Sequence, residues 1–402
     1  MPQRERVLGD SEASGGCHPT SGTRNLPRVA VVHERFTDRG GSESVVEQLC
    51  AIWPQAELFA PIIDETQLPD GLRAATVHDT MLRMLYRGHG RHAHLLPLLP
   101  AAMASIDLTG FDLVLTSHHT FAQRVRPPAD IPMVSYVHTP ARWMWDARVR
   151  EQELGSRVGH MALSAFATRQ RGPDRAAAAR PDVVVAASRA VAGRIASWWN
   201  RQVPVVHPPV DVDRFRPAGR QAREDFFLYV GRLVPRKRPD VAIAAARAAG
   251  VRLVVVGEGR SRPALEQMSG RRVEVLGRVS DEQLRDLYRR CAGLVVPGEE
   301  DFGQVAVEAQ ACGTPVLALG AGGSLDTVVD GVTGRLWRPV SDDTAVGTLA
   351  HELRRFDPGA YDAREVRRHA ERFAPDRFRR ELQTVVEEVV PWMRHTASRL
   401  AA

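Results

Sequence analysis

Residues 293–320 read GLVVPGEEDFGQVAVEAQACGTPVLALG. An apolar strand leads into an acidic, glycine-containing turn, a helical pattern follows, and a second apolar strand ends the stretch, as in a parallel α/β sheet. Glu300 precedes the helix and Glu308 lies two turns along it. The two carboxylates can therefore contact two parts of one elongated ligand, with the free N–H groups of the helix N-terminus between them. An acidic turn that only complements the helix dipole, plus a surface glutamate, explains the pair equally well.

The same alternation of strands and helices extends over most of the chain and predicts two successive β-α-β series. Strands are expected at 28–33, 111–117, 132–138, 182–188 and 204–210, and then at 226–232, 252–258, 273–278, 293–298 and 315–320. Helices are expected at 42–53, with Ser42 as N-cap, and at 240–250, 281–292 and 302–313. The proline-rich, charged segment 207–225 between the series is typical of a linker. The sequence therefore predicts two Rossmann-like domains, each with a doubly wound sheet. Doubly wound sheets bind ligands at the carboxyl ends of their strands.

Composition narrows the class of protein. The 402 residues are 44% hydrophobic and 25% charged, which are ordinary values for a globular chain of two domains. A net charge of +6 suits an anionic ligand, a membrane surface or a nucleic acid. The sequence contains no RNA-binding aromatic motif, zinc finger or basic zipper, so we expect no nucleic-acid partner. The four cysteines lack C-x-x-C spacing, and residues 1–26 lack an apolar core; we expect a mobile leader and a cytoplasmic protein.

A cluster of cations follows the first strand of the second series. Gly231 ends that strand, and four basic residues follow within seven positions: Arg232, Arg236, Lys237 and Arg238. An anionic diphosphate requires charge-assisted contacts of this kind, with arginine as a fork and lysine as a point charge. A basic surface turn is the simpler alternative.

Residues 256–260, VGEGR, start like a dinucleotide-binding fingerprint. The third glycine is missing because position 262 is arginine, which argues against a nicotinamide oxidoreductase. We interpret the segment as a strand-to-helix turn at the edge of the nucleotide site.

The first half offers two candidate features at strand ends. Gly40 and Gly41 follow the first strand and permit close approach of the backbone to a phosphate or sugar, although a simple tight turn is as good an explanation. His138 ends another strand, where a structural histidine would be the commoner finding. Neither His118-His119 nor the aspartates Asp107 and Asp112 provide a metal-binding context, so no metal is expected.

These motifs together resemble glycosyltransferase family 4. The resemblance rests on the E-x7-E segment and its continuation to residue 334, and on GRLVPRKRPD, LGRVSDEQLRDLY, RGGSESVVEQL and YVHTPARWMWD. It covers about residues 28–380 and is closest in look to bacterial mannosyltransferases. It implies a GT-B fold with a central cleft, retention of anomeric configuration, and no cofactor. The implied domains are a leader (1–26), an acceptor-side domain (27–215), a nucleotide-sugar domain (216–375) and C-terminal helices crossing back (376–402).

The resemblance also assigns roles. Arg232 and Lys237 would hold the diphosphate and its departing charge, Glu300 would orient the sugar hydroxyls, and His138 would position the sugar. Glu308 would bind the ribose. The implied donor-binding residues are Gly40, Gly41, Gly231, Arg278, Val279, Phe302, Gly303, Gln304 and Glu308. Glycine is common in the family at the position of Arg238, whose role is therefore open.

Partners and rival functions follow from the same residues. The expected partner is a GDP- or UDP-linked sugar, with GDP-mannose as the first guess, and a glycan, lipid-linked or small-molecule acceptor. A nucleotide-sugar epimerase of the same fold and a non-catalytic nucleotide-sugar-binding protein remain alternatives. Residues 81–98 carry Arg83, Arg87 and Arg91 beside apolar residues. Such a segment suits peripheral contact with an anionic membrane, and a basic loop near the acceptor is the alternative.

Overall fold

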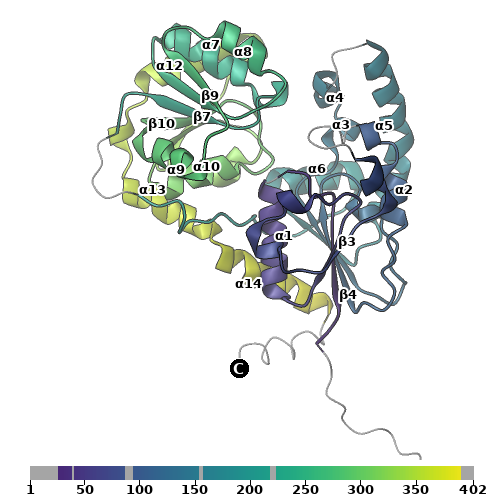
Figure 1. Cartoon of the computed structure of the whole chain (residues 1–402). Helices are drawn as coiled ribbons and strands as arrows, with labels where there is room; N and C mark the ends of the chain where they lie inside the picture. The colour runs from purple at the N-terminus through teal and green to yellow at the C-terminus, as the bar shows by residue number, and fades with distance from the viewer. Residues whose placement is uncertain (1–25, 39, 87–93, 154–156, 218–222, 391–402) are drawn as a thin grey trace, which may run out of the picture.

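The computed structural model describes residues 26–38, 40–86, 94–153, 157–217 and 223–390. The predicted leader up to residue 25, Arg87, Arg91 and the chain after residue 390 lie outside these ranges. Two lobes, each built on a six-stranded parallel sheet, are visible in Figure 1. None of the helices within the described ranges has both the length and the apolar character needed to cross a membrane.

The first lobe contains one sheet with helices on both faces. Its strands are β1 (Val29–His33), β2 (Glu57–Phe59), β3 (Val77–His78), β4 (Leu113–His118), β5 (Met133–Val137) and β6 (Val183–Ala186). Its helices are α1 (Gly41–Ile52), α2 (Leu99–Ala104), α3 (Arg142–Trp145), α4 (Ala147–Glu153), α5 (Arg157–Ala178) and α6 (Arg189–Trp199). The strand order is β3-β2-β1-β4-β5-β6.

The second lobe repeats this plan. Its strands are β7 (Phe227–Val230), β8 (Leu253–Val256), β9 (Val273–Gly277), β10 (Gly293–Val296), β11 (Val316–Leu319) and β12 (Gly334–Trp337). Its helices are α7 (Pro239–Ala249), α8 (Arg262–Met268), α9 (Asp281–Arg290), α10 (Gln304–Ala311), α11 (Ser324–Thr327), α12 (Ala345–Arg355) and α13 (Ala363–Ala370). The strand order is β12-β11-β10-β7-β8-β9.

Both sheets place their first strand beside their fourth, with the second and third strands on one side and the fifth and sixth on the other. This is the doubly wound Rossmann order, and ligands bind where the direction of winding reverses, beyond the carboxyl ends of the strands. In the first lobe that point lies after β1 and β4, and in the second lobe it lies after β7 and β10. The segments predicted to carry chemistry follow several of these strands.

Alternate residues along each strand enter different cores. Val29 and Val31 pack on the face of the first sheet that is covered by α1, whereas Ala30 and Val32 pack on the opposite face with α2. In the second lobe one face packs against α10 and the other against α7 and α12. The strands are buried on both faces, which explains their nearly continuous apolar sequences.

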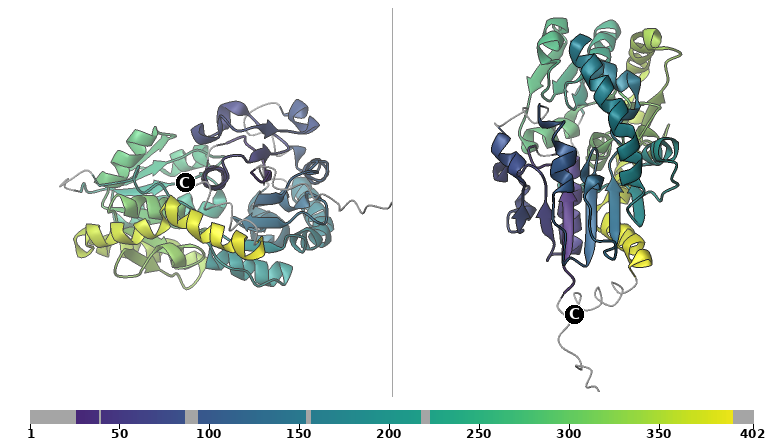
Figure 2. Two further views of the ribbon diagram at one scale, coloured as in Figure 1. Left: turned by 90° about the horizontal axis from the view of Figure 1, so that it is seen from below. Right: turned by 90° about the vertical axis from the view of Figure 1, so that its right-hand side faces the viewer.

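The last helix joins the two lobes. Helix α14 (Pro375–Val389) leaves the second lobe and lies along α1 of the first, as Figures 1 and 2 show. Its residues Phe378, Leu382 and Val386 are buried in the core of the first sheet, on the face covered by α1. The chain thus crosses between the lobes twice, once through residues 200–226 and once before α14.

Three expectations about local structure were wrong or incomplete. Segment 204–210 forms a single bridge, Val205 to Ala186, and no strand, because prolines 208 and 209 have no N–H to donate. Helix α1 begins at Gly41 with Gly40 as N-cap, so Ser42 lies inside the helix and its hydroxyl donates to Glu43. The pattern also missed β2, β3 and β12, which have four residues at most.

Candidate active site

Glu300 and Lys237 form a part-buried ion pair at the switch point of the second sheet. Glu300 follows β10 and is 9% exposed, and Lys237 ends the short 3-10 helix Pro235–Lys237 after β7. The Lys237 ammonium donates to Oε2 of Glu300. Burial lowers the pKa of Lys237, and the negative charge of Glu300 opposes that shift. The carboxylate therefore helps to keep a cation in the place where a diphosphate would require one.

The glycines around this loop have a packing function. The N–H of Gly231 donates to the carbonyl of Val256. A Cβ atom on Gly257 would lie 1.9 Å from the carbonyl oxygen of Gly231, and one on Gly259 would lie 2.3 Å from that of Leu233. The V-G-E-G-R segment thus packs its backbone directly against the loop that carries the cations, and this close packing accounts for its glycines.

The neighbouring arginines of that loop differ in their surroundings. Arg238 has a left-handed backbone, with φ of 53°, and its side chain pairs with Asp342 at 3.2 Å and with Asp240 at 3.7 Å. Its charge is therefore already matched by two carboxylates. Arg236 has a buried Nη1 atom without a hydrogen-bond partner among the described residues, and its charge helps to lower the pKa of Asp301.

Glu308 lies on α10 and has a different kind of partner. The hydroxyl of Tyr288, a fully buried residue of α9, donates to Oε2 of Glu308 at 2.8 Å. Burial raises the pKa of Glu308 from its ordinary 4.5 to about 7, although the Tyr288 hydrogen bond acts in the opposite direction. Glu308 therefore titrates near neutral pH in the ligand-free protein.

The N-terminus of α10 lies between the two glutamates. Gly303 is its N-cap, with φ of 100°, a conformation that favours glycine. The ring of Phe302 packs against Phe373 and His207, so only its backbone is available to a ligand. A Cβ atom on Gly41 would lie 2.0 Å from Oε1 of Gln304. Glycine at position 41 therefore lets the first turn of α1 approach the first turn of α10 across the lobes.

Arg278 and Val279 lie after β9, at the edge of the second sheet. The N–H of Arg278 donates to Glu258 at 3.3 Å, and Val279 is half-buried against the core beside α10. The structure thus gathers Gly41, Gly303, Gln304, Glu300 and Lys237 around the N-terminus of α10. The backbone of Arg278 instead contacts Glu258, in the turn that follows β8.

His138 lies on the first-lobe side, directly after β5. Its Nε2 atom is 2.8 Å from the hydroxyl oxygen of Ser117 on β4. Burial lowers the pKa of His138 to about 3. The ring is consequently neutral at physiological pH.

An ion cluster between the lobes was not predicted from the sequence. Arg194 of α6 pairs with Glu299 at 2.5 Å and also with Asp301. Arg142 of α3 lies 3.4 Å from each of the same two acids. Burial alone would raise the pKa of Asp301, but Arg194 and Arg142 outweigh it and the pKa is lowered. The acidic turn before α10 is therefore tied to the first lobe.

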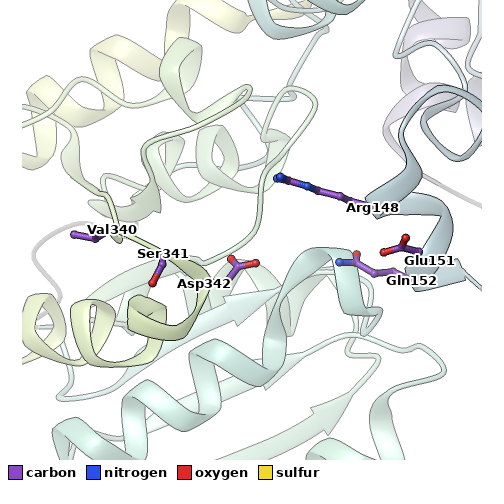
Figure 3. Close-up of a pocket in the computed structure, with 6 residues that line it drawn as sticks. All are labelled: Arg148, Glu151, Gln152, Val340, Ser341 and Asp342. Carbon is purple, nitrogen blue, oxygen red and sulfur yellow. The ribbon is translucent and has the colours of Figure 1, made fainter.

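A cavity of about 760 Å³ opens at another part of the boundary between the lobes. Figure 3 shows Arg148, Glu151 and Gln152 of α4 facing Val340, Ser341 and Asp342 of the second lobe across it. Its lining is mostly polar and charged, and Val340 is almost fully exposed.

The segment expected to contact membranes is only partly described. Met81, Met84 and Leu85 are exposed on the 3-10 helix Met81–Leu85. Arg83 is paired with Asp79 at 3.1 Å and with Glu65 at 3.5 Å, so its charge is locally balanced.

Comparisons with known proteins agree with this architecture. The family model described as Glycosyltransferase Family 4 matches residues 39–214, and the one described as Glycosyl transferases group 1 matches residues 212–354. The two doubly wound parallel domains, together with these matches, identify the fold as GT-B, a class of glycosyltransferase fold. The chain belongs to glycosyltransferase family 4.

Curated relatives share part of the chain. It is 39% identical over 197 residues to the D-inositol 3-phosphate glycosyltransferase of Mycolicibacterium paratuberculosis, covering 44% of this chain and 45% of the relative. The corresponding protein of Mycobacterium tuberculosis is 42% identical over 156 residues, 34% of this chain and 32% of the relative. The matches thus span less than half the length of these relatives.

Solved structures share the fold over nearly the whole chain. HepE of Anabaena in complex with UDP and glucose has a TM-score of 0.63 at 18% identity, covering 90% of this chain and all of that one. Sucrose-phosphate synthase of Thermosynechococcus elongatus has a TM-score of 0.67 at 20% identity, covering 91% and 100%.

Proposed function

We propose that the protein transfers a hexose from a nucleoside diphosphate sugar to an acceptor hydroxyl, with retention of anomeric configuration and without a metal. Residues 216–375 would bind the donor, and residues 27–215 would provide the acceptor side. The proposal depends chiefly on one observation: the part-buried Lys237–Glu300 pair lies at the N-terminal end of α10, and the Tyr288–Glu308 pair lies along the same helix.

The two pairs suit the two ends of a nucleotide sugar. Lys237 and Arg232, together with the N–H groups at the start of α10, would stabilise the diphosphate as the glycosidic bond breaks. Oε2 of Glu308 is already bound by Tyr288, so Oε1 is the atom left for the ribose hydroxyls. Glu300 would orient the sugar hydroxyls, supported by the backbone of Phe302 and Gly303. Retention follows the family precedent and would proceed by attack on the same face that the diphosphate leaves.

Two nucleotide sugars are candidate donors, and several kinds of molecule are candidate acceptors. GDP-mannose is our first candidate donor, from the resemblance to bacterial mannosyltransferases. UDP-glucose is the second, because HepE of Anabaena was solved with UDP and with UDP-glucose. The curated relatives are named for D-inositol 3-phosphate, which makes it one acceptor to test beside glycan and lipid-linked acceptors.

A thermal-shift panel of GDP, UDP and ADP tests the donor site, because a ligand that binds only the folded state raises its melting temperature. We expect one diphosphate to raise it in the presence of EDTA. Transfer with that nucleotide linked to mannose or glucose should also persist in EDTA, because basic side chains occupy the place where a metal-dependent site would have acidic ligands. Loss of transfer in EDTA, restored by magnesium or manganese, would contradict the metal-free mechanism. Isomerisation of the nucleotide sugar without any acceptor would favour an epimerase.

A further inference from the structure

Four buried or half-buried side chains form a hydrogen-bonded row at the switch point of the first sheet. Glu43 of α1 lies 3.4 Å from Nε2 of His33, which ends β1. Nδ1 of His33 lies 3.0 Å from the hydroxyl oxygen of Ser117 on β4, and that oxygen lies 2.8 Å from Nε2 of His138. His33 and Ser117 are fully buried, and Glu43 is 7% exposed. The row therefore ends at His138, to which the resemblance to glycosyltransferase family 4 assigns the positioning of the sugar.

The direction of donation along the row is set at its Glu43 end. A carboxylate only accepts hydrogen bonds. Burial alone would raise the pKa of Glu43, but its hydrogen bonds with His33, the backbone and Ser42 oppose burial and the pKa is lowered. The hydroxyl of Ser42 donates to the other carboxylate oxygen at 2.9 Å. Glu43 is thus an ionised acceptor, and His33 must carry its proton on Nε2.

The remaining donors follow in order. The 3.4 Å separation between Glu43 and His33 is longer than the roughly 2.7–2.9 Å of a charge-assisted bond, which favours a neutral His33 ring. Nδ1 of a neutral ring with its proton on Nε2 is an acceptor, so Ser117 donates its only proton to it. The oxygen of Ser117 can then only accept, and Nε2 of His138 must donate to it. The lone pair of His138 is left on Nδ1.

We propose that Glu43, His33 and Ser117 are positioning residues that hold His138 as the Nε2–H tautomer and present its Nδ1 as a hydrogen-bond acceptor for a sugar hydroxyl. No described residue is recorded as a hydrogen-bond partner of that Nδ1 atom. The identity of the hydroxyl rests on the proposed function, whereas the tautomer is a property of the protein without ligand. A site of this polarity recognises a hydroxyl proton and rejects an analogue that lacks it, because an acceptor covered by the bound sugar is then left unpaired.

The opposite polarity is a definite alternative. If His33 carried protons on both nitrogens, it would donate to Ser117, Ser117 would donate to Nε2 of His138, and His138 would carry its own proton on Nδ1. His138 would then donate a hydrogen bond to the sugar. The two arrangements differ in the tautomer of one ring, which nitrogen NMR measures directly.

The first experiment uses the full chain, labelled with nitrogen-15 in its histidines, without ligand at pH 7.5. The His138 signals are assigned by their loss in His138→Gln. We expect the Nε2–H tautomer in the parent protein and in Ser117→Thr, which keeps the hydroxyl, and a mixture of tautomers in Ser117→Ala. An Nδ1–H tautomer in the parent, or an Nε2–H tautomer unchanged in Ser117→Ala, would overturn the proposal.

Kinetics separate the positioning role from a structural one. Loss of one neutral hydrogen bond is worth about 0.5–1.5 kcal/mol, so Ser117→Ala should lower kcat roughly two- to tenfold while the KM for the donor changes less than about twofold. Ser117→Thr should restore kcat. Equal kcat in Ser117→Ala and in the parent, with both proteins folded, would contradict the role. If none of GDP, UDP and ADP raises the melting temperature of the parent, the proposed function fails, while the NMR result still decides the tautomer.

Discussion

Glu300 and Glu308 lie eight residues apart, yet their partners differ in kind. Glu300 accepts a hydrogen bond from the ammonium of Lys237, a cation, whereas Glu308 accepts one from the neutral hydroxyl of Tyr288. Burial and the phenol leave Glu308 with a pKa of about 7. Glu300 is matched by a full positive charge that is itself nearly buried.

The difference shows that two glutamates of one motif need not have the same role. A carboxylate paired with a cation holds that cation charged in a buried place, where a phosphate can also use it. The phenol occupies one oxygen of Glu308, and burial raises the pKa of this carboxyl to about 7, so the affinity for any ligand on its other oxygen depends on pH. We therefore expect the Lys237–Glu300 end to affect turnover and the Tyr288–Glu308 end to affect binding.

The largest effect is expected when the cation is removed. Lys237→Met should lower kcat about a hundred- to a thousandfold, the usual cost of losing one donor to developing negative charge. Steady-state kinetics with the active donor measure it. Arg238→Met is the matched control, because Arg238 is paired with Asp342 and Asp240, and it should retain kcat within about threefold.

The same variant leaves Glu300 buried without its partner, which could unfold the loop. The double variant Lys237→Met/Glu300→Gln removes the uncompensated charge and should melt closer to the parent than Lys237→Met does. If this double variant turns over like the parent, the cation has no role in the reaction.

Truncation of the two glutamates should change different kinetic parameters. Glu300→Ala should lower kcat, and Glu308→Ala should raise the KM for the donor, each by roughly ten- to a hundredfold for the loss of about 1.5–3 kcal/mol. Both variants must melt near the parent, because either glutamate could instead stabilise its helix. A folded Glu300→Ala protein with normal turnover would contradict the proposed active site.

The sequence predicts the positions of Glu300 and Glu308 in the second lobe better than it predicts which residues bond to them. Residues 293–320 contain a strand, a turn, α10 and a second strand in one contiguous stretch, so the positions of Glu300 and Glu308 follow from local pattern. Tyr288 lies inside an ordinary amphipathic helix, and only tertiary packing turns its hydroxyl toward Glu308. Its role carries no local signal.

The first-lobe side shows why the remaining residues were missed. His33, Glu43 and Ser117 lie up to 84 residues apart and meet because β1 and β4 pair in register, with His33 opposite Ser117. Arg194 meets Asp301 only because the two lobes come together. A signal existed for part of this: His33 ends β1 and Ser117 is the last residue but one of β4, and parallel sheets bind ligands at the carboxyl ends of their strands.

Nucleotide affinity should depend on pH through Glu308. With a pKa of about 7, the carboxylate is mostly ionised at pH 8 and mostly protonated at pH 6, so the Kd for the nucleoside diphosphate should rise about tenfold as pH falls between them. The apo protein responds with the opposite sign: the stability that this carboxyl contributes is full below pH 4.5 and is lost as pH rises through 7. Calorimetric titration measures the affinity. Glu308→Gln is the control, because it retains the titration of the phosphate itself; equal pH dependence in both proteins would contradict the assignment.

The smallest expected effect separates the phenol from the carboxylate. Tyr288 is fully buried, and its ring packs edge-on against Phe215 at 5.7 Å, so Tyr288→Phe should keep the packing and lose only the hydroxyl. That hydroxyl lowers the pKa of Glu308. Its loss should move the midpoint of the pH dependence upward and weaken nucleotide binding at pH 7.5 by roughly two- to fivefold. Tighter binding with an unmoved midpoint would mean that the phenol competes with the ribose for Oε2, in which case Tyr288 restrains the donor site instead of tuning it.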